Sequence, residues 1–259
     1  MTTAPHASPD ARELTPEHTL GEIVTRRPGA ARVLERLGLD YCCGGARTLA
    51  DACADADVSS AEVSSAEVLD AIEALQPEDT PDWASMGPAE LVDHLEATHH
   101  RYLHAELPRL TPLAEKVASV HGDRHPELHD VRDDLAALRA DLEPHLMKEE
   151  RALFPMIREL ATTDADAAPP EFHCGSLRNP ISVLLAEHDT AGAMLERLRH
   201  RTAGYTVPDD GCASYLALYE GLAELEADTH LHVHKENNLL FPAVIALEER
   251  THEGGGVGR

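Results

Sequence analysis

The sequence predicts an all-α protein, a four-helix bundle preceded by a small helical N-terminal domain, and three observations support this. Alanine, leucine and glutamate dominate the 259 residues while aromatic residues make up only 3%, a composition that favours helices over sheets. In the second half of the chain, apolar residues recur every three or four positions, which is the spacing of one helix face. A histidine–glutamate pattern also occurs twice, each time in helical register.

The chain divides by composition into two blocks between polar ends. Residues 1–13 and 251–259 have few apolar side chains, and we expect both segments to be disordered. Residues 14–76 are expected to form the small helical domain, and residues 88–250 the bundle. The stretch 77–87 is expected to be a linker, because prolines and acidic residues open it.

Short helices are expected in the small domain. Thr15 followed by Pro16 predicts a helix N-terminus, because threonine caps helices and proline is tolerated in their first turn. Gly38 stands where a following helix should end, the stretch 40–45 (DYCCGG) predicts a tight loop, and a last helix is expected around Val68. Large apolar residues are few here, so we expect this domain to need support from the bundle or from a partner chain in a homodimer.

The first helix of the bundle is the least regular. It is expected to begin near Pro88, and Pro108 and Pro112 should kink or break it, because a proline inside a helix removes a hydrogen bond. Its apolar period slightly favours His99 over His100 as the residue that faces inward.

The other three helices each carry a continuous apolar stripe that includes residue types able to bind metals. A glutamate in such a core position is costly unless it is paired or bound to a metal. The stripes are Leu135, Leu138, Leu142, His145, Glu149, Leu153 and Met156 in the second helix, Ile181, Leu184, Leu185, His188, Ala191, Leu195 and Leu198 in the third, and Leu218, Leu222, Leu225, Thr229, His232, Glu236 and Leu239 in the fourth.

The repeated pattern places His145 four residues before Glu149 and His232 four residues before Glu236, with a Phe-Pro pair after each glutamate. One such pair alone would more often be a surface ion pair or a hydrogen-bonded core histidine. Two copies on apolar stripes predict a metal site, because facing helices bring two histidines and two carboxylates to one point, as in dinuclear iron and manganese bundles. Imidazoles and carboxylates without thiolates suit iron, manganese or zinc. We expect the lysine before each glutamate to be solvated or near the metals rather than a ligand.

Charge and cysteine content restrict the partners and the location. A formal charge of −25 argues against a nucleic acid as partner, since binding one requires a field of the opposite sign. The absence of an apolar leader and of any run of 18 apolar residues predicts a cytoplasmic protein without a membrane partner. Five cysteines, an odd number, are expected to be reduced.

Several motifs together resemble one known family. They are DYCCGG (40–45), HLMKEERALFPMI (145–157), AEHDTAG (186–192) and HVHKENNLLFP (232–242), in this order. The combination resembles the hemerythrin-like di-iron proteins for repair of iron centres. That resemblance implies a hemerythrin-like four-helix bundle that holds two non-haem iron ions per chain, bridged by oxo and carboxylate groups. It also implies a role in restoring iron–sulfur proteins damaged by nitric oxide or oxygen species.

The resemblance also implies a ligand set and a reason to doubt oxygen carriage. It favours His100 over His99 on the first helix, and a Val-His-x-Asp context adds His121. Asn237 stands where oxygen-carrying hemerythrins have an aspartate, and the carboxylate here comes one residue earlier. The implied metal ligands are His100, His121, His145, Glu149, His188, His232 and Glu236.

The adjacent Cys42 and Cys43 are interpreted as a reactive thiol pair, since a disulfide between neighbours is strained. Metal binding, acceptance of a nitrosyl group and thiol exchange all remain open for this pair. Cys174 and Cys212 are interpreted as incidental, and Cys53 as a packing residue. Two other functions compete with cluster repair: a nitric oxide or oxygen sensor or carrier, and a nitric oxide reductase or peroxidase.

Overall fold

The structure is a computed structural model that describes residues 14–55, 64–76, 81–163 and 170–254. The described residues confirm the all-α prediction, because they form helices and only two isolated β-bridges. The chain divides into two compact units, residues 1–80 and 81–259, which are described separately below. The expectation of disorder for residues 1–13 and 255–259 falls outside the described residues.

The N-terminal unit consists of four short helices around a small apolar core. Thr19, rather than Thr15, caps the first helix: its side chain accepts from the Glu22 amide, and the Glu22 carboxylate accepts from the Thr19 amide. Gly38 has a φ of +66° just after the second helix, the left-handed conformation that ends many helices. The helices are α1 (Leu20–Arg26), α2 (Ala30–Arg36), α3 (Leu49–Asp55) and α4 (Ser65–Glu73).

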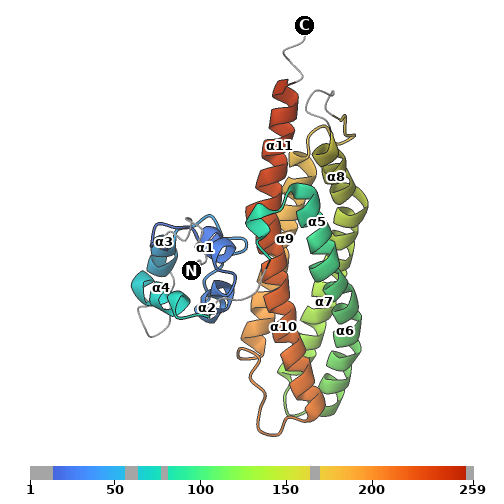
Figure 1. The fold of residues 1–259 in the computed structure, drawn as a ribbon. Coiled ribbons are helices and arrows are strands. Elements are labelled where there is room, and N and C mark those ends of the chain that lie inside the picture. Colours follow the sequence, from blue (N-terminus) through green and yellow to red (C-terminus); the bar gives the residue numbers. More distant parts are fainter. Residues whose placement is uncertain (1–13, 56–63, 77–80, 164–169, 255–259) are drawn as a thin grey trace, which may run out of the picture. The chain divides into compact units, whose positions relative to one another are not determined.

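The second unit is the expected four-helix bundle, in which four long rods run alongside one another (Figure 1). A short 3-10 turn, η1 (Trp83–Ser85), precedes it within the stretch expected to be a linker. The rods are α5 (Pro88–Leu95), η2 (Glu96–His100) and α6 (Arg101–His121); α7 (Glu127–Lys148), η3 (Glu149–Leu153) and α8 (Phe154–Thr162); α9 (Arg178–Arg201); and α10 (Ala213–Lys235), η4 (Glu236–Leu240) and α11 (Phe241–Gly254). Helix α11 thus continues past Thr251, where we expected a disordered tail to begin.

The first rod corrects one expectation, because α6 continues without interruption through Pro108 and Pro112. A proline inside a helix costs about 3 kcal/mol or more. Leu103, Leu107 and Leu110 are each at most 1% exposed in the same helix, and burial of one leucine stabilises by about 1.5–3 kcal/mol. Packing of this face is therefore comparable in size to the cost of the two prolines.

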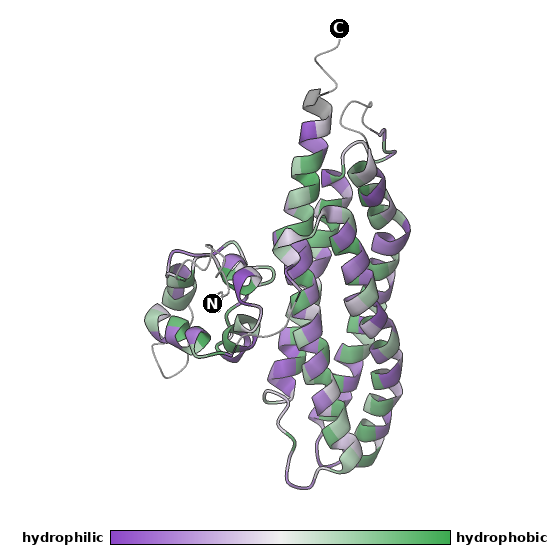
Figure 2. Ribbon diagram, in the orientation of Figure 1, coloured by the Kyte–Doolittle hydropathy of each residue, from purple (hydrophilic) through white to green (hydrophobic). Residues whose placement is uncertain are grey.

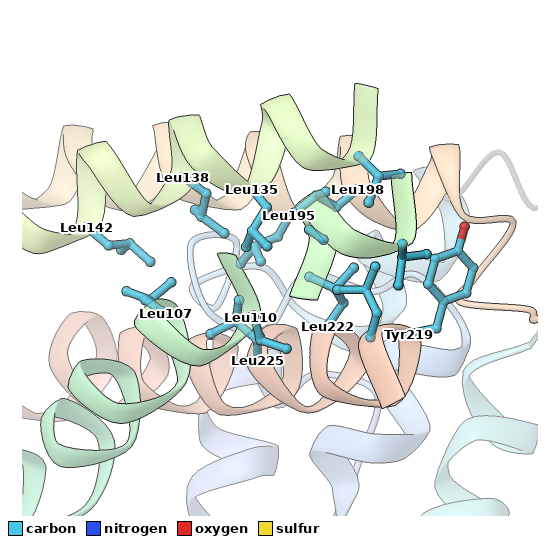
Figure 3. Close-up of a cluster of buried hydrophobic side chains, with 14 of the residues drawn as sticks. Leu107, Leu110, Leu135, Leu138, Leu142, Leu195, Leu198, Tyr219, Leu222 and Leu225 are labelled. Carbon is cyan, nitrogen blue, oxygen red and sulfur yellow. The ribbon is translucent and has the colours of Figure 1, made fainter. Parts of the chain in front are cut away.

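The bundle core consists of two apolar clusters, one on either side of a layer of buried histidines and glutamates. The larger cluster joins α6, α7, α9 and α10, and Figure 3 shows Leu110, Leu195 and Leu222 among the side chains that point toward one another. The second cluster includes Phe154 and Phe241, on α8 and α11. Hydrophobic and hydrophilic residues alternate along each rod (Figure 2). Among the described helices, none contains a stretch long and apolar enough to cross a bilayer.

Candidate metal centre

Three wide turns interrupt the bundle helices at the layer between the two apolar clusters. They are the π-helical segments η2, η3 and η4, in which hydrogen bonds span five residues instead of four, and such turns are frequent at functional sites. Pro155 and Pro242 are the second residues of the helices that follow η3 and η4, where a missing N–H is tolerated. The repeated Phe-Pro pair in the sequence thus marks the end of each wide turn.

Six of the seven expected ligands come together at these turns, in two groups that share both glutamates. Each group offers four ligand atoms within 4.8 Å of one another, and all of the residues are buried. The first group is His100, Glu149, His232 and Glu236, and the second is His145, Glu149, His188 and Glu236.

The two oxygens of each carboxylate are divided between the groups. Oε2 of Glu149 lies 3.5 Å from Nε2 of His100, and its Oε1 lies 3.4 Å from Nε2 of His145. Oε1 of Glu236 lies 3.2 Å from Nε2 of His232, and its Oε2 lies 3.2 Å from Nε2 of His188. The arrangement suits two cations, each with two imidazoles, joined by two bridging carboxylates.

The strongest sign of a bound cation is a set of buried polar atoms that have no hydrogen-bond partner in the described part of the chain. Both carboxylate oxygens of Glu149 and of Glu236 belong to it, as do Nε2 of His100 and Nε2 of His232. Both glutamates have no exposed side-chain surface. A buried charged group that makes no hydrogen bond costs several kcal/mol, and a cation at this point would remove that cost.

Three of the four histidines are oriented through their other ring nitrogen. Nδ1 of His100 lies 3.0 Å from Glu150, Nδ1 of His145 lies 2.9 Å from Glu187, and Nδ1 of His188 lies 2.8 Å from the amide oxygen of Asn237. An oxygen acceptor there holds the proton on Nδ1 and leaves the Nε2 lone pair free for a metal. The sequence did not indicate these three orienting residues, although each adjoins an expected ligand.

Burial and opposite charge also set the ionisation of the cluster. Burial alone would raise the pKa of Glu236, but the facing His232 and His188 hold it well below its usual range. Burial alone would lower the pKa of His145, but the Glu149 carboxylate outweighs this effect and raises it to about 9. Both effects follow from imidazoles and carboxylates packed together without a cation.

The wide turn η2 explains why the apolar period did not identify the first-helix residue. His99 and His100 are 3% and 1% exposed, so both face the interior, but toward different neighbours. His99 donates from Nδ1 to Asp228 at 2.8 Å and accepts at Nε2 from Lys235 at 2.7 Å. Burial, with Lys235 beside it, lowers the pKa of His99 to about 3, which keeps the ring neutral. His100 is the one that joins the clustered ligands.

The two lysines of the repeated pattern lie in different environments. Lys148 is half exposed and pairs with Glu187, as a solvated lysine would. Lys235 is 2% exposed, contacts His94 and lies 4.1 Å from the centre of the Trp83 ring. Burial lowers the pKa of Lys235 to about 8. No sequence signal separated the two lysines, because they occupy equivalent positions.

The seventh expected ligand, His121, lies apart from the cluster. It is the last residue of α6, which continues directly from His100, so the two residues are roughly 30 Å apart along the helix. Its Nε2 lies 3.1 Å from Sγ of Cys212. The Val-His-x-Asp context pointed to a ligand, but the straight helix places this residue at the far end of the rod.

A small pocket adjoins the clustered ligands. Its volume of about 10 Å³ leaves room for one water-sized molecule. Its lining includes three of the clustered histidines. The lining residues are Asp141, Leu142, His145, Glu187, His188, Ala191, Thr229, His232 and Val233.

In the N-terminal unit, one carboxylate organises the DYCCGG loop. Oδ1 of Asp40 accepts from the amides of Cys42 and Cys43 and from the Cys42 thiol, and Oδ2 accepts from the Gly44 amide. A Cβ at Gly44 would lie 2.7 Å from the Asp40 carbonyl oxygen, so only glycine fits there. The Cys43 thiol, burial and Asp40 raise the pKa of Cys42 well above its usual range. Cys42 is therefore a buried thiol, whereas Cys43 is half exposed.

Comparison with known proteins identifies both parts of the chain. Residues 91–244 match the family described as hemerythrin HHE cation binding domain, and residues 16–76 match a domain of unknown function, DUF542. The iron–sulfur cluster repair protein YtfE of Escherichia coli O81 (strain ED1a) is 36% identical over 236 residues, which cover 90% of this chain and 98% of the relative. The protein of the same name from Escherichia fergusonii gives the same values. The chain therefore belongs to the family of hemerythrin-like iron–sulfur cluster repair proteins, which its motifs resemble.

Proposed function

We propose that this protein helps to repair iron–sulfur clusters damaged by nitric oxide or oxidants, using a di-iron centre in its bundle. The observation that supports this most is the set of six buried, unpartnered oxygen and nitrogen atoms on the two glutamates, His100 and His232. Two iron ions, bridged by the carboxylates and by an oxo group, fit that donor set. The names of the relatives support the repair role.

Each side chain has a distinct task in this proposal. Glu149 and Glu236 bridge the two ions, and the histidines His100, His232, His145 and His188 occupy terminal positions. Glu150, Glu187 and Asn237 hold three of the rings in the tautomer that binds. When bound, the two iron ions supply redox chemistry and a position for a small ligand. His121 is left out of the proposed ligand set, because it lies at the other end of α6.

Cys42 and Cys43 are proposed to hold a transferred group between the centre and the damaged client protein. Cys43 is half exposed, so an incoming group meets it first. Cys42 is buried and kept as a thiol by its neighbours, so it is suited to donating a proton or a hydrogen bond. Iron, a nitrosyl group and a thiol are the three kinds of group that fit this proposal.

Metal analysis of protein isolated without air tests the centre. The wild type is expected to hold two iron ions per chain and to give a Mössbauer signal of a bridged pair that changes on exposure to nitric oxide. A Glu149→Ala, Glu236→Ala double variant is expected to hold none. A Glu143→Ala, Glu224→Ala double variant is the matched control, because it removes two exposed glutamates from α7 and α10. At most one metal per wild-type chain, with equal binding by the first double variant, would refute the dinuclear centre.

A recovery assay tests the repair role. An iron–sulfur enzyme inactivated with nitric oxide is incubated with the metal-loaded protein, and its activity is followed. We expect recovery with the wild type and with Cys53→Ser, but not with Cys42→Ser, Cys43→Ser, while all three proteins keep the same iron content. Recovery no faster than with an equal amount of free iron would remove repair as the function.

The small pocket favours a second candidate, the binding or reduction of a diatomic gas. The pocket touches His145 and His188 of one group and His232 of the other, and it has room for a very small molecule. A sensor or carrier would bind the gas reversibly, with no effect of the cysteine variants. A nitric oxide reductase or peroxidase would consume many equivalents of its substrate per chain when a reductant is present.

A further inference from the structure

A second cluster of reactive side chains lies at the end of α6 that is farther from the clustered histidines and glutamates. Cys212 is the residue immediately before α10, and His121 is the last residue of α6. Residues 91 positions apart in the chain are thereby brought together, with Nε2 of His121 lying 3.1 Å from Sγ of Cys212. Neither the proposed metal centre nor the DYCCGG loop uses this pair.

The two side chains differ sharply in exposure. Cys212 is exposed, so its sulfur is accessible to molecules in solution. His121 is 4% exposed, and its Nδ1 has no hydrogen-bond partner in the described part of the chain. Tyr215 packs edge-on against the His121 ring at 5.4 Å and fixes its plane. A buried imidazole with one unpartnered nitrogen is costly, and its other nitrogen is directed at the thiol.

Cys212 also occupies the N-cap position of α10, a helix of 23 residues. Amide groups at a helix N-terminus favour a negative charge, and thiolates at this position are stabilised. The hydrogen bond with His121, followed by the amides of Tyr215 and Ser214, lowers the pKa of Cys212 to about 7. A large fraction of this thiol is therefore ionised at neutral pH.

The other charged groups near the sulfur are already paired. Asp210, two residues before Cys212, pairs with Arg124 and with Nε2 of His125. These pairs reduce the repulsion between its negative charge and the Cys212 thiolate. His125 also pairs with Glu127 at the start of α7. On the α6 side, the ammonium group of Lys116 donates to the Ser214 hydroxyl in the first turn of α10 and adds a positive charge. His121 remains the group in direct contact with the sulfur.

Three of the other four cysteines are less suited to reaction with a disulfide in solution. Burial and its neighbours raise the pKa of Cys42 well above its usual range, and burial raises the pKa of Cys53. Cys174 is half buried, with its sulfur 4.0 Å from the sulfur of Met156. Cys212 thus combines exposure with a partner that stabilises the thiolate.

We propose that Cys212 and His121 form a thiol-exchange site that reacts with low-molecular-weight disulfides and carries a mixed disulfide at Cys212. The Cys212 thiolate attacks one sulfur of the small disulfide. The sulfur–sulfur bond of that molecule breaks, a new bond forms between its attacked sulfur and Sγ of Cys212, and the other half leaves as a thiolate that takes a proton from water. One disulfide is consumed and one is formed, so no further oxidant is required.

The size of the expected effect follows from two opposing factors. A thiol of pKa near 7 has about 15 times more thiolate at pH 7 than an ordinary cysteine of pKa about 8.5, but each thiolate is intrinsically about fivefold less nucleophilic. Loss of the His121 contact should therefore slow the reaction by up to about threefold at pH 7, because the amides of Tyr215 and Ser214 still stabilise the thiolate. Above about pH 9, where both thiols are ionised, the variant should react faster than the wild type, so that the two rate profiles cross.

The test uses the full-length, metal-loaded protein with glutathione disulfide as the probe, and peptide mass spectrometry to locate the adduct. Cys212 is expected to be modified first in the wild type, and Cys212→Ser should lose that adduct. His121→Phe, which keeps a ring against Tyr215, should show a loss of up to about threefold at pH 7 and the crossing at high pH. His125→Phe is the matched control, because it removes a nearby histidine that does not contact the sulfur, and it should react like the wild type.

Two results of the thiol-exchange measurements would overturn this proposal. Modification of another cysteine before Cys212 is one, and indistinguishable rates for His121→Phe and wild type from pH 6 to 10 are the other. Iron content is measured on the same samples. Loss of iron in His121→Phe would return His121 to the metal centre and also end the proposal, whereas failure of thiol exchange with iron retained leaves the proposed repair function untouched.

Discussion

Glu149 and Glu236 each direct one carboxylate oxygen at one pair of histidines and the other oxygen at a second pair. The distances to the four Nε2 atoms lie between 3.2 and 3.5 Å, and neither carboxylate has exposed side-chain surface. A single ion would use only one side of this arrangement. The symmetry of the two glutamates is the structural basis for expecting two ions.

The neighbouring residues His99 and His100 should respond differently to substitution. His100→Ala removes a clustered ligand and should reduce the bound iron to one ion per chain or fewer. His99→Gln should keep two, because His99 contacts Asp228 and Lys235 instead. Iron analysis of the two purified variants checks this. If His99→Gln lost iron and His100→Ala kept it, the assignment of these two residues would have to be exchanged.

Removal of the metal should destabilise the bundle. A ligand that binds only the folded state adds about 4 kcal/mol when its free concentration is 1,000 times its dissociation constant. Chelation should therefore lower the midpoint of thermal unfolding of the wild type. The Glu149→Ala, Glu236→Ala double variant should unfold at the same temperature with and without chelator, and a chelator-sensitive midpoint in that variant would argue against these two bridging ligands.

The stability contribution of His145 should depend on pH in the metal-free protein. Its pKa is raised to about 9 in the folded state, so its contribution is complete below about pH 6.5 and is lost as the pH rises through 9. Lys235, whose pKa is lowered to about 8, acts in the opposite direction, so the wild type alone is not informative.

The measurement is therefore a difference between two proteins. The free energy of unfolding of the metal-free wild type minus that of His145→Leu should fall by up to about 3 kcal/mol between pH 6 and 10. Urea unfolding at each pH gives both values. A difference that stays constant or grows with pH would contradict the charged His145 in the metal-free cluster.

Asp40 should stabilise the small domain through its loop contacts. Asp40→Ala removes the acceptor of three backbone amides, and one such hydrogen bond contributes about 0.5–1.5 kcal/mol. Asp40→Asn keeps one acceptor oxygen and should cost less. Limited proteolysis of the loop region reports the change. Equal protease resistance in wild type and Asp40→Ala would mean that the loop does not depend on this carboxylate.

Much of the molecule could be predicted from sequence because its signals are periodic. The stripes through His145, Glu149, His232 and Glu236 indicated helix type, inward face and candidate ligand residues together, since a glutamate is rarely buried unless a cation balances its charge. The error at the first helix boundary was local, because Thr19 rather than Thr15 is the N-cap of α1. Thr19 has a glutamate three residues later in the chain, which completes the capping box, and Thr15 does not.

The differences between expectation and structure at the site have a different origin. A period of 3.6 residues cannot place His99 and His100 correctly, because the helix is locally wider there. Lys148 and Lys235 share one motif position, and only the helices packed around each determine that one is half exposed and the other buried. His121 was placed by local context, which contains no information about its distance along a continuous helix.

The wide turns also bear on how such a centre arises and disappears. Each of η2, η3 and η4 closes its hydrogen bonds over one residue more than a regular helix turn. Deleting one residue from 96–100 would let α5 and α6 join as one regular helix, with the faces of both helices kept and only the side chains within the turn redirected. Single-codon insertions and deletions at these three places are therefore expected to rearrange the buried layer of histidines and glutamates while the bundle survives.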